Sequence, residues 1–510
     1  MNEAYEAVVK TAAALTGIGV LCLIHRQGAQ AVNRRRLILR LAVALGALGY
    51  VNYGGFHTDG TPLHIWDQFH YVIGSKYFPE LGYDGIYAAL LAARHEATPS
   101  RPLPSRARDL RTGRIVSTAS LSGFMLEVRE RFSDSRWSAF RADALSFQLR
   151  DEILLDHGYN PTPARTAIER LFTAHLPFRT RTAALFAIPD FLLLAAAGAV
   201  IRRVFGLEAL AAVALVFGLG FCSRYYWVGG AFLRQDWLVA LIFAAAALAL
   251  RRPRLAGAAL AYAACTRVFP ILMLLPLALF GLSAWRRDRS FDSTRFFAEG
   301  FVAVAVGLLV AGCLAGRGPT AWLESAERLR VHSSAVGPNA IGLRVILSTS
   351  MTNLRGDLVD PTTFYDYERI ADDVAQTGRD NLMLISLATA VLLGLSAVVA
   401  STTRDPVVAL AAGVGVIYAV ATPSAYYGSF FTLLALVQPI RTAVVFLTAS
   451  VLMYGGAGLV LLLSRAGTIR LNGAAVYTPV SVMLLLVLVW WLYDMRGKRS
   501  GLPIPPERPS

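Results

Sequence analysis

Charged residues are scarce in this sequence: only 16% of its 510 residues are Asp, Glu, Lys or Arg, whereas 55% are hydrophobic. Long apolar runs recur from one end of the chain to the other, which predicts a polytopic membrane protein. The first run follows Asn2, Glu3 and Glu6 and has no small-residue cleavage site. We therefore expect a retained membrane span there instead of a removed signal peptide.

Cysteine is also scarce, and the common catalytic motifs are missing. All four cysteines lie inside apolar runs without metal-ligand spacing, which predicts buried, unpaired thiols: Cys22, Cys222, Cys265 and Cys313. No GxxxxGK(S/T) phosphate loop occurs, which excludes an ATP-driven pump, and GxSxG, HExxH and CxxC are absent as well. We expect no cofactor, with a divalent metal left open. We also expect no nucleic-acid partner, because the sequence has no module of interleaved aromatic and basic residues.

The net charge of +15 has a topological cause. Basic residues gather in alternate short links, such as Arg34–Arg36, Arg202–Arg203 and Arg286–Arg289, and the positive-inside rule places these links in the cytoplasm. A scheme of about thirteen spans puts all of them on one side. The expected fold is an all-α polytopic bundle of about thirteen transmembrane helices, with a helical outer (periplasmic) domain formed by long loops.

This scheme divides the chain into six parts. They are N-terminal transmembrane helices (1–53), a long first outer loop with the catalytic segment and amphipathic helices (54–182), a transmembrane bundle (183–315), a second outer loop (316–381), C-terminal transmembrane helices (382–493) and a cytoplasmic tail (494–510). In the first outer loop, apolar residues recur at spacings of three and four over Leu121–Arg131 and Ser138–Leu155, which predicts two amphipathic helices.

The densest group of titratable and aromatic side chains lies in residues 66–87, WDQFHYVIGSKYFPELGYDGIY. Such a density beside a membrane span predicts a functional site at the membrane surface. The candidate catalytic carboxylates are Asp67, Asp59 and Asp84. Asp67 ranks first, because it follows a span closely enough to lie at the headgroup level and could accept a proton there. The alternative is an interfacial helix whose aromatic residues anchor it in the membrane surface.

The segment DQFHYVIGSKYFPELGYDGIY resembles the first outer loop of the GT-C superfamily of glycosyltransferases, in the form found in polyprenyl-phosphate-mannose-dependent mannosyltransferases. Two further segments are similar to that family: TRVFPILMLLPLALFGL (266–282) and HSSAVGPNAIGLRVIL (332–347). The resemblance implies a GT-C bundle and gives Asp67 the role of the base. The chain departs from the family pattern by an extra N-terminal span and an unusually long first outer loop.

Basic residues near the outer ends of spans are the candidates for binding the donor phosphate. Arg267 lies between two short apolar pieces broken at Pro270, where irregular backbone can line a cavity. Arg234 can offer a bidentate fork to phosphate, and Lys76 is an alternative. The substrate-binding residues expected in full are His64, His70, Lys76, Tyr77, His157, Tyr159, Arg234, Asp236, Arg267, His332 and Asn339. The segment TPSAYYG (422–428) is expected to add aromatic walls.

Simpler explanations exist for several of these residues. Arg234 and Asp236 could anchor a span at the headgroups, and the side chain of Arg267 could extend to the interface. A lone loop histidine such as His332 is more often solvated than functional. The segment DHGYNPTP (156–163) could be a rigid turn.

The expected function is transfer of a mannose-like sugar or a pentose from a polyprenyl-phosphate donor to a lipid or glycan on the outer face of a bacterial inner membrane. The outer loops contain no nucleotide-binding glycine-rich turn, which argues for a lipid-linked donor. The expected partners are that donor, the acceptor and membrane lipids. The alternative is a transporter or flippase of a polyprenyl-linked or anionic substrate. Such proteins usually have internal repeats and charges at midspan, and the sequence shows neither. A non-catalytic membrane scaffold is a third alternative.

Overall fold

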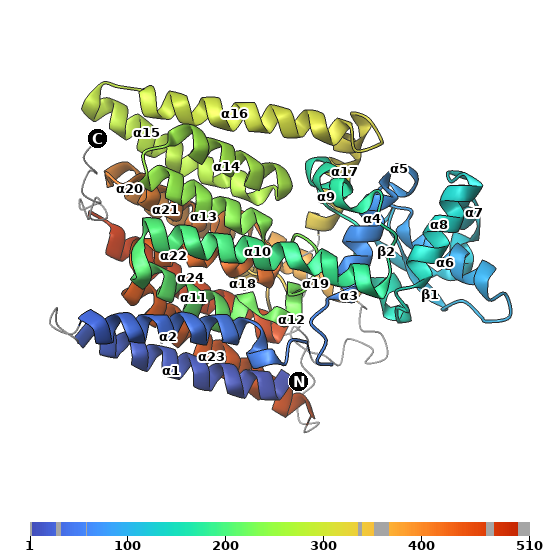
Figure 1. Ribbon diagram of the computed structural model, residues 1–510, viewed down its shortest axis with the longest axis horizontal. Coiled ribbons are helices and arrows are strands. Elements are labelled where there is room, and N and C mark those ends of the chain that lie inside the picture. The colour runs from blue at the N-terminus through green and yellow to red at the C-terminus, as the bar shows by residue number, and fades with distance from the viewer. Residues whose placement is uncertain are drawn as a thin grey trace.

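The computed structural model describes residues 3–26, 32–57, 59–334, 339–350, 367–465 and 474–497. Long helices form one bundle, and a group of short helices projects from one end of it (Figure 1). We call this second group, residues 65–178, the head module. Two short strands in the head module, β1 (Arg106–Asp109) and β2 (Arg114–Ser117), pair in antiparallel fashion.

The bundle is built from helices throughout the chain. Its elements are α1 (Glu3–Arg26), α2 (Val32–Tyr50), α10 (Thr180–Val204), α11 (Gly206–Leu219), α12 (Tyr225–Val228), α13 (Asp236–Ala249), α14 (Pro253–Thr266), α15 (Leu274–Asp288), α16 (Asp292–Cys313), α18 (Leu343–Leu347), α20 (Leu382–Thr402), α21 (Pro406–Val420), α22 (Thr432–Val437), α23 (Pro439–Arg465) and α24 (Ala474–Met495). Helices α17 (Thr320–Ser334) and α19 (Tyr367–Asp380) lie in the expected second outer loop.

Seven helices of the described residues are long and apolar enough to cross a membrane: Tyr5–Ile24, Arg181–Val204, Phe269–Asp288, Asp292–Cys313, Leu382–Thr402, Pro439–Val460 and Ala475–Met495. The pair Gly206–Leu219 and Phe221–Val228, bent by 74°, makes up to eight. Three shorter apolar helices are Asp236–Ala249, Pro406–Val420 and Ala425–Val437. The chain is therefore an all-α, multi-pass membrane protein, with fewer helices passing this test than the thirteen spans expected.

The head module has a core of its own, made of aromatic and aliphatic side chains that include Phe69, Tyr77 and Phe140. Its helices are α3 (Ile65–Gln68), α4 (Gly74–Lys76), α5 (Phe78–Leu81), α6 (Ile86–Ala97), α7 (Ser122–Glu130), α8 (Asp134–Leu145) and α9 (Pro163–Thr173). A π turn, Phe69–Ile73, joins α3 to α4. The module thus holds itself together by hydrophobic burial, apart from the bundle core.

The two amphipathic helices differ in how well the sequence predicts them. Helix α7 matches the expected segment Leu121–Arg131 closely. The predicted helix over Ser138–Leu155 is wrong at both ends, because α8 begins earlier and ends at Leu145. Gln148 then takes a left-handed backbone conformation, with φ of 48°, which a continuing helix cannot accommodate.

The prediction that every cysteine is buried is also wrong. Cys222 is buried, but Cys22 is exposed, and Cys265 and Cys313 are half-buried. Cys22 is exposed because its neighbour Leu21 takes the packed face of α1. The four thiols are unpaired, as expected.

Helices α2 and α11 cross at glycines. A Cβ atom built on Gly218 would lie 1.8 Å from the carbonyl oxygen of Gly46, so the two backbones touch there. Close crossings of this kind at small residues are typical of membrane helices. The buried Lys10 of α1 reaches the same crossing and donates hydrogen bonds to the carbonyls of Gly218, at 2.7 Å, and Gly49. This contact positions the α11–α12 region, which leads to the candidate site.

We predict that Gly218→Val destabilises the protein by about 1–3 kcal/mol, because the added methyl groups must force α2 and α11 apart. Thermal unfolding of the detergent-solubilised protein measures the loss. Gly19→Val is the matched control, because a Cβ at Gly19 meets nothing within 4 Å. Equal midpoints for the two variants would show that the crossing is not a tight contact.

Candidate active site

Asp67 lies in α3, where the bundle meets the head module (Figure 1). His64 is the N-cap of this helix, and its Nδ1 accepts a hydrogen bond from the backbone N–H of Asp67 at 3.1 Å. This cap fixes the start of the helix and therefore the direction of the Asp67 side chain. That side chain is 14% exposed, and its Oδ2 atom is buried, so the carboxylate is only partly open at the site.

The loop 229–235 packs directly against the Asp67 segment. Gly230 has a φ of 70°, and a Cβ there would lie 1.8 Å from the carbonyl oxygen of Pro62, so only glycine fits. The Gly230 carbonyl accepts hydrogen bonds from the N–H of His64, at 3.1 Å, and from Nε2 of Gln68, at 2.9 Å. The two segments are thereby held in one fixed relation.

The same loop is fastened to α10. Both oxygens of the buried Asp190 carboxylate accept backbone hydrogen bonds, one from the N–H of Arg234 at 2.8 Å and one from that of Gln235 at 3.0 Å. Buried backbone N–H groups need such partners. Asp190 therefore sets the position from which the Arg234 side chain departs.

Arg234 forms an ion pair with Asp67. Its Nε lies 2.9 Å from Oδ2 of Asp67, and its Nη1 donates a hydrogen bond to the hydroxyl of Tyr71. The guanidinium also lies over the rings of Tyr71, at 4.6 Å, and Tyr426, at 5.1 Å. These contacts hold a buried cation and orient the carboxylate beside it.

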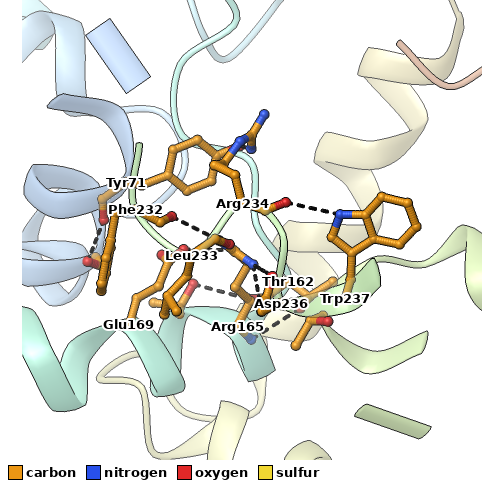
Figure 2. Close-up of polar contacts among 12 residues, drawn as sticks. Tyr71, Thr162, Arg165, Glu169, Phe232, Leu233, Arg234, Asp236 and Trp237 are labelled. Carbon is orange, nitrogen blue, oxygen red and sulfur yellow. Dashed lines mark hydrogen bonds and ion pairs between the residues drawn. The ribbon is translucent and has the colours of Figure 1, made fainter. Parts of the chain in front are cut away.

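Arg165, at the first turns of α9, links two buried carboxylates (Figure 2). Its Nε donates to Glu169 at 2.7 Å, and its Nη1 donates to both oxygens of Asp236, at 2.9 and 3.0 Å. Its Nη2 donates to the carbonyls of Phe232, at 3.3 Å, and Leu233. Burial raises the pKa of Glu169 to about 7, although the Arg165 guanidinium opposes this shift. Arg165 thus ties α9 of the head module to the start of α13.

Arg267 lies where α14 ends and the η7 turn Phe269–Met273 begins. Its side chain is buried, and its Nε and Nη2 have no hydrogen-bond partner within the described part of the chain. Its guanidinium is 5.9 Å from the ring of Tyr71 and 5.6 Å from that of Tyr427. Because buried donors without an acceptor are costly, this cation is suited to receive an anion.

Tyr71 is surrounded by three arginines. Its ring lies 4.6 Å from Arg234, 5.5 Å from Arg165 and 5.9 Å from Arg267. We call these four residues together with Asp67 the arginine cluster. The cluster draws side chains from α3, the π turn, α9, the 229–235 loop and the end of α14.

The expected aromatic wall lies beside this cluster. The residues around Ser424 pair with those around Ala340 in an antiparallel bridge, and the N–H of Ala425 donates to the Asn339 carbonyl at 2.7 Å. This pairing places Tyr426 over Arg234 and Tyr427 over Arg267. Asn339 thus contributes through its backbone to positioning the wall.

His70 lies in the π turn, three residues after Asp67, and its ring is buried. Its Nε2 is 2.8 Å from the hydroxyl of Tyr87, and its Nδ1 is 4.0 Å from the Asp156 carboxylate, which also accepts a hydrogen bond from Trp66 Nε1 at 2.6 Å. Burial lowers the pKa of both His64 and His70. Both are therefore predominantly neutral imidazoles near pH 7 and supply polar contacts without adding positive charge.

Other predicted site residues make their contacts away from the cluster. Lys76 forms a buried ion pair with Asp143 at 2.6 Å, and Tyr77 donates to the same carboxylate at 2.8 Å. Lys76 is therefore already neutralised inside the head module. Asp84 pairs with Arg131 at 3.4 Å. Asp59 accepts hydrogen bonds from Thr61 in an exposed turn.

The remaining predicted residues have mixed positions. The ring centroids of Tyr159 and Tyr71 are 6.1 Å apart, and the Tyr159 hydroxyl donates a hydrogen bond to the Glu169 carboxylate at 3.0 Å. Tyr159 therefore supports two residues of the site. The His157 carbonyl accepts a hydrogen bond from Arg328 at 2.8 Å. Asp236 is buried against Arg165 and also accepts from Tyr262 at 2.9 Å, which makes it a support and not a surface anchor. The side chain of His332 lies outside the described residues.

Sequence reasoning missed Arg165, Glu169 and Tyr71 as members of the site. A signal for the first two was present, because Thr162 and Pro163 form a helix start and Arg165 and Glu169 follow at a spacing of four. Their role as a link to Asp236 depends on contacts across 71 positions of the chain, which periodicity does not reveal.

Comparisons with known proteins add no relative: no protein-family model, no curated protein and no solved structure matches this chain. Among the residues that the structure describes, no three or more His, Cys, Asp or Glu side chains are grouped so that they could hold a metal ion.

We predict that the protein loses stability as the pH falls from 6.5 towards 4. Burial lowers the pKa of His57 from 6.5 to about 4, and its Nε2 contacts the Gly229 carbonyl at 2.9 Å. In this pH window His57 binds a proton in the unfolded chain but not in the folded chain, and this difference favours unfolding. Thermal unfolding against pH should show a shallower decline for His57→Gln. His175→Gln, at an exposed position, should decline as the wild type does; identical slopes in all three proteins would contradict the prediction.

Proposed function

We propose that this protein is a membrane glycosyltransferase that moves a mannose-like sugar or a pentose from a polyprenyl-phosphate donor to a hydroxyl of a lipid or glycan. The observation that carries the proposal is the arginine cluster, in which the partly exposed carboxylate of Asp67 lies beside the buried guanidiniums of Arg234 and Arg267. Arg267 has buried donors without an acceptor among the described residues, and Asp67 is 2.9 Å from Arg234. A base next to an anion site is what glycosyl transfer from a phosphate donor requires.

In the proposed reaction the acceptor hydroxyl oxygen attacks the anomeric carbon of the donor sugar. The new carbon–oxygen bond forms as the bond between the sugar and the phosphate oxygen breaks, and the bonding electrons leave with the polyprenyl phosphate. Asp67 takes the hydroxyl proton. Arg267 and Arg234 stabilise the charge that develops on the departing phosphate.

The position of the cluster supports a donor that arrives through the membrane. It lies at the end of the bundle that carries the head module, where an isoprenoid could lie between helices while its phosphate reaches the arginines (Figure 1). The tyrosines at 426 and 427 offer flat faces for a sugar or an isoprenoid. Lys76 is not proposed as a phosphate ligand, because Asp143 already neutralises it.

The proposed topology is a GT-C-like bundle of about thirteen transmembrane helices. The seven long helices and the bent pair account for eight of these spans. The other five would be α2, α13, α14, α21 and the α22 segment, which are shorter or more polar. The arginine-rich links would face the cytoplasm of a bacterium, and the cluster would open to the outer side of the inner membrane.

We predict that Asp67→Asn lowers sugar transfer by about 10²–10⁴-fold, because the amide cannot accept the hydroxyl proton. The assay follows radiolabelled sugar from polyprenyl-phosphate-mannose, or from its arabinose or glucose analogues, in membranes. Asp84→Asn is the matched control and should keep full activity, because Asp84 pairs with Arg131 in the head module. Full transfer by a folded Asp67→Asn protein would exclude Asp67 as the base.

The same assay separates the enzyme from the transporter. If no donor supports transfer and a lipid-linked sugar instead crosses the bilayer of reconstituted vesicles, the protein is a flippase and the proposed function is wrong.

We predict that Arg267→Gln lowers kcat/KM for the donor by roughly tenfold to a hundredfold, the usual contribution of a hydrogen bond to a charged group. Arg267→Lys should recover part of this loss, because the charge returns without the fork of donors. Arg181→Gln, at an exposed position near the start of α10, should leave the kinetics unchanged. A wild-type kcat/KM in Arg267→Gln would show that this arginine does not bind the donor.

A further inference from the structure

A second cationic site lies at the opposite end of the bundle from the head module. A cavity of about 620 Å³ opens between the start of α2, the end of α10 and the start of α11. Four arginines line it: Arg35, Arg36 and Arg40 from α2 and Arg202 from α10. These elements lie at the end of the bundle distant from the head module (Figure 1).

The described residues do not balance the positive charge in this cavity. Glu208 is the one acidic residue among the described residues that line it, and it pairs with Arg35 at 2.7 Å. The Nε of Arg35 is nevertheless buried without a hydrogen-bond partner in the described part of the chain. A general preference for basic residues in cytoplasmic links does not require arginines from two separate segments to share one cavity. Their convergence points to an anion.

The lining is amphipathic, which distinguishes a lipid from a free anion. Val32, Leu39 and Leu207 contribute apolar surface to the cavity. Val32 is 50% exposed and Leu207 is half-buried, so both present apolar surface at the cavity. An acyl chain could lie along these two side chains while the headgroup phosphate contacts the guanidiniums.

We propose that this cavity binds the headgroup of an anionic phospholipid. The phosphodiester accepts hydrogen bonds from Arg36, Arg40 and Arg202, and from the unpartnered Nε of Arg35. Basic pockets between membrane helices bind anionic lipid headgroups in this way. The site is independent of the arginine cluster and of the proposed glycosyl transfer.

The test uses the full-length protein in mixed micelles that contain phosphatidylglycerol and phosphatidylcholine in equal amounts. Native mass spectrometry measures the ratio of the two lipids retained by the protein. The triple variant Arg36→Gln/Arg40→Gln/Arg202→Gln should retain phosphatidylglycerol at least about tenfold less than the wild type, since each surface cation contributes on the order of 1 kcal/mol to binding an anionic lipid. These three side chains are exposed, so their replacement leaves the fold intact.

The matched control removes the same number of charges from another arginine-rich link. Arg286→Gln/Arg287→Gln/Arg289→Gln changes exposed residues at the end of α15 that do not line the cavity. Its lipid ratio should equal that of the wild type. Equal loss in both triple variants, or no loss in the first, would overturn the proposal. Displacement of the lipid by millimolar inorganic phosphate would also overturn it, because the site would then bind free phosphate.

Discussion

The site depends on keeping three guanidiniums around one tyrosine ring at the edge of a membrane protein. Arg165, Arg234 and Arg267 lie within 6 Å of the Tyr71 ring, and like charges so close together repel strongly in a medium of low polarity. Two of the three are compensated: Arg234 by Asp67, and Arg165 by Asp236 and Glu169. Arg267 has neither an ion-pair nor a hydrogen-bond acceptor in the described part of the chain for two of its nitrogens. The uncompensated positive charge of the cluster is therefore located at Arg267, which is where we expect an anion to bind.

Backbone hydrogen bonds fix the relative positions of the residues in this arrangement. The loop that carries Arg234 is held by Asp190 on one side and, through Gly230, by the segment of Asp67 on the other. The loop follows α11 and the short helix α12. The close glycine crossing between α11 and α2 fixes the position of α11 in the bundle, and therefore the position from which the loop begins. The distance between the carboxylate and the guanidinium is thus set by rigid helices and not by the two side chains alone.

The sequence predicts the class of the fold and part of the site. Apolar runs identify a multi-pass helical protein, and residue chemistry near span ends picks out Asp67, Arg234 and Arg267, which the structure brings around Tyr71. The number of spans does not follow from the apolar runs, because short helices such as α13 and α21 pack inside the bundle and need not match the membrane thickness. Lys76 and Asp84 were indistinguishable from site residues in the sequence, because their partners Asp143 and Arg131 are distant along the chain.

The bond between Arg165 and Asp236 also has a consequence for biosynthesis. Arg165 belongs to the head module, and its partner lies 71 residues later, at the start of a membrane helix. During synthesis Arg165 has its first partner, Glu169, as soon as α9 is made, but its second partner, Asp236, is made only later. Removing one carboxylate from a buried ion-pair network is unfavourable, so α9 reaches its final packing only after the start of α13 is in place. The arginine cluster also takes Arg267 from the end of α14, and its assembly therefore waits for two later segments of the chain.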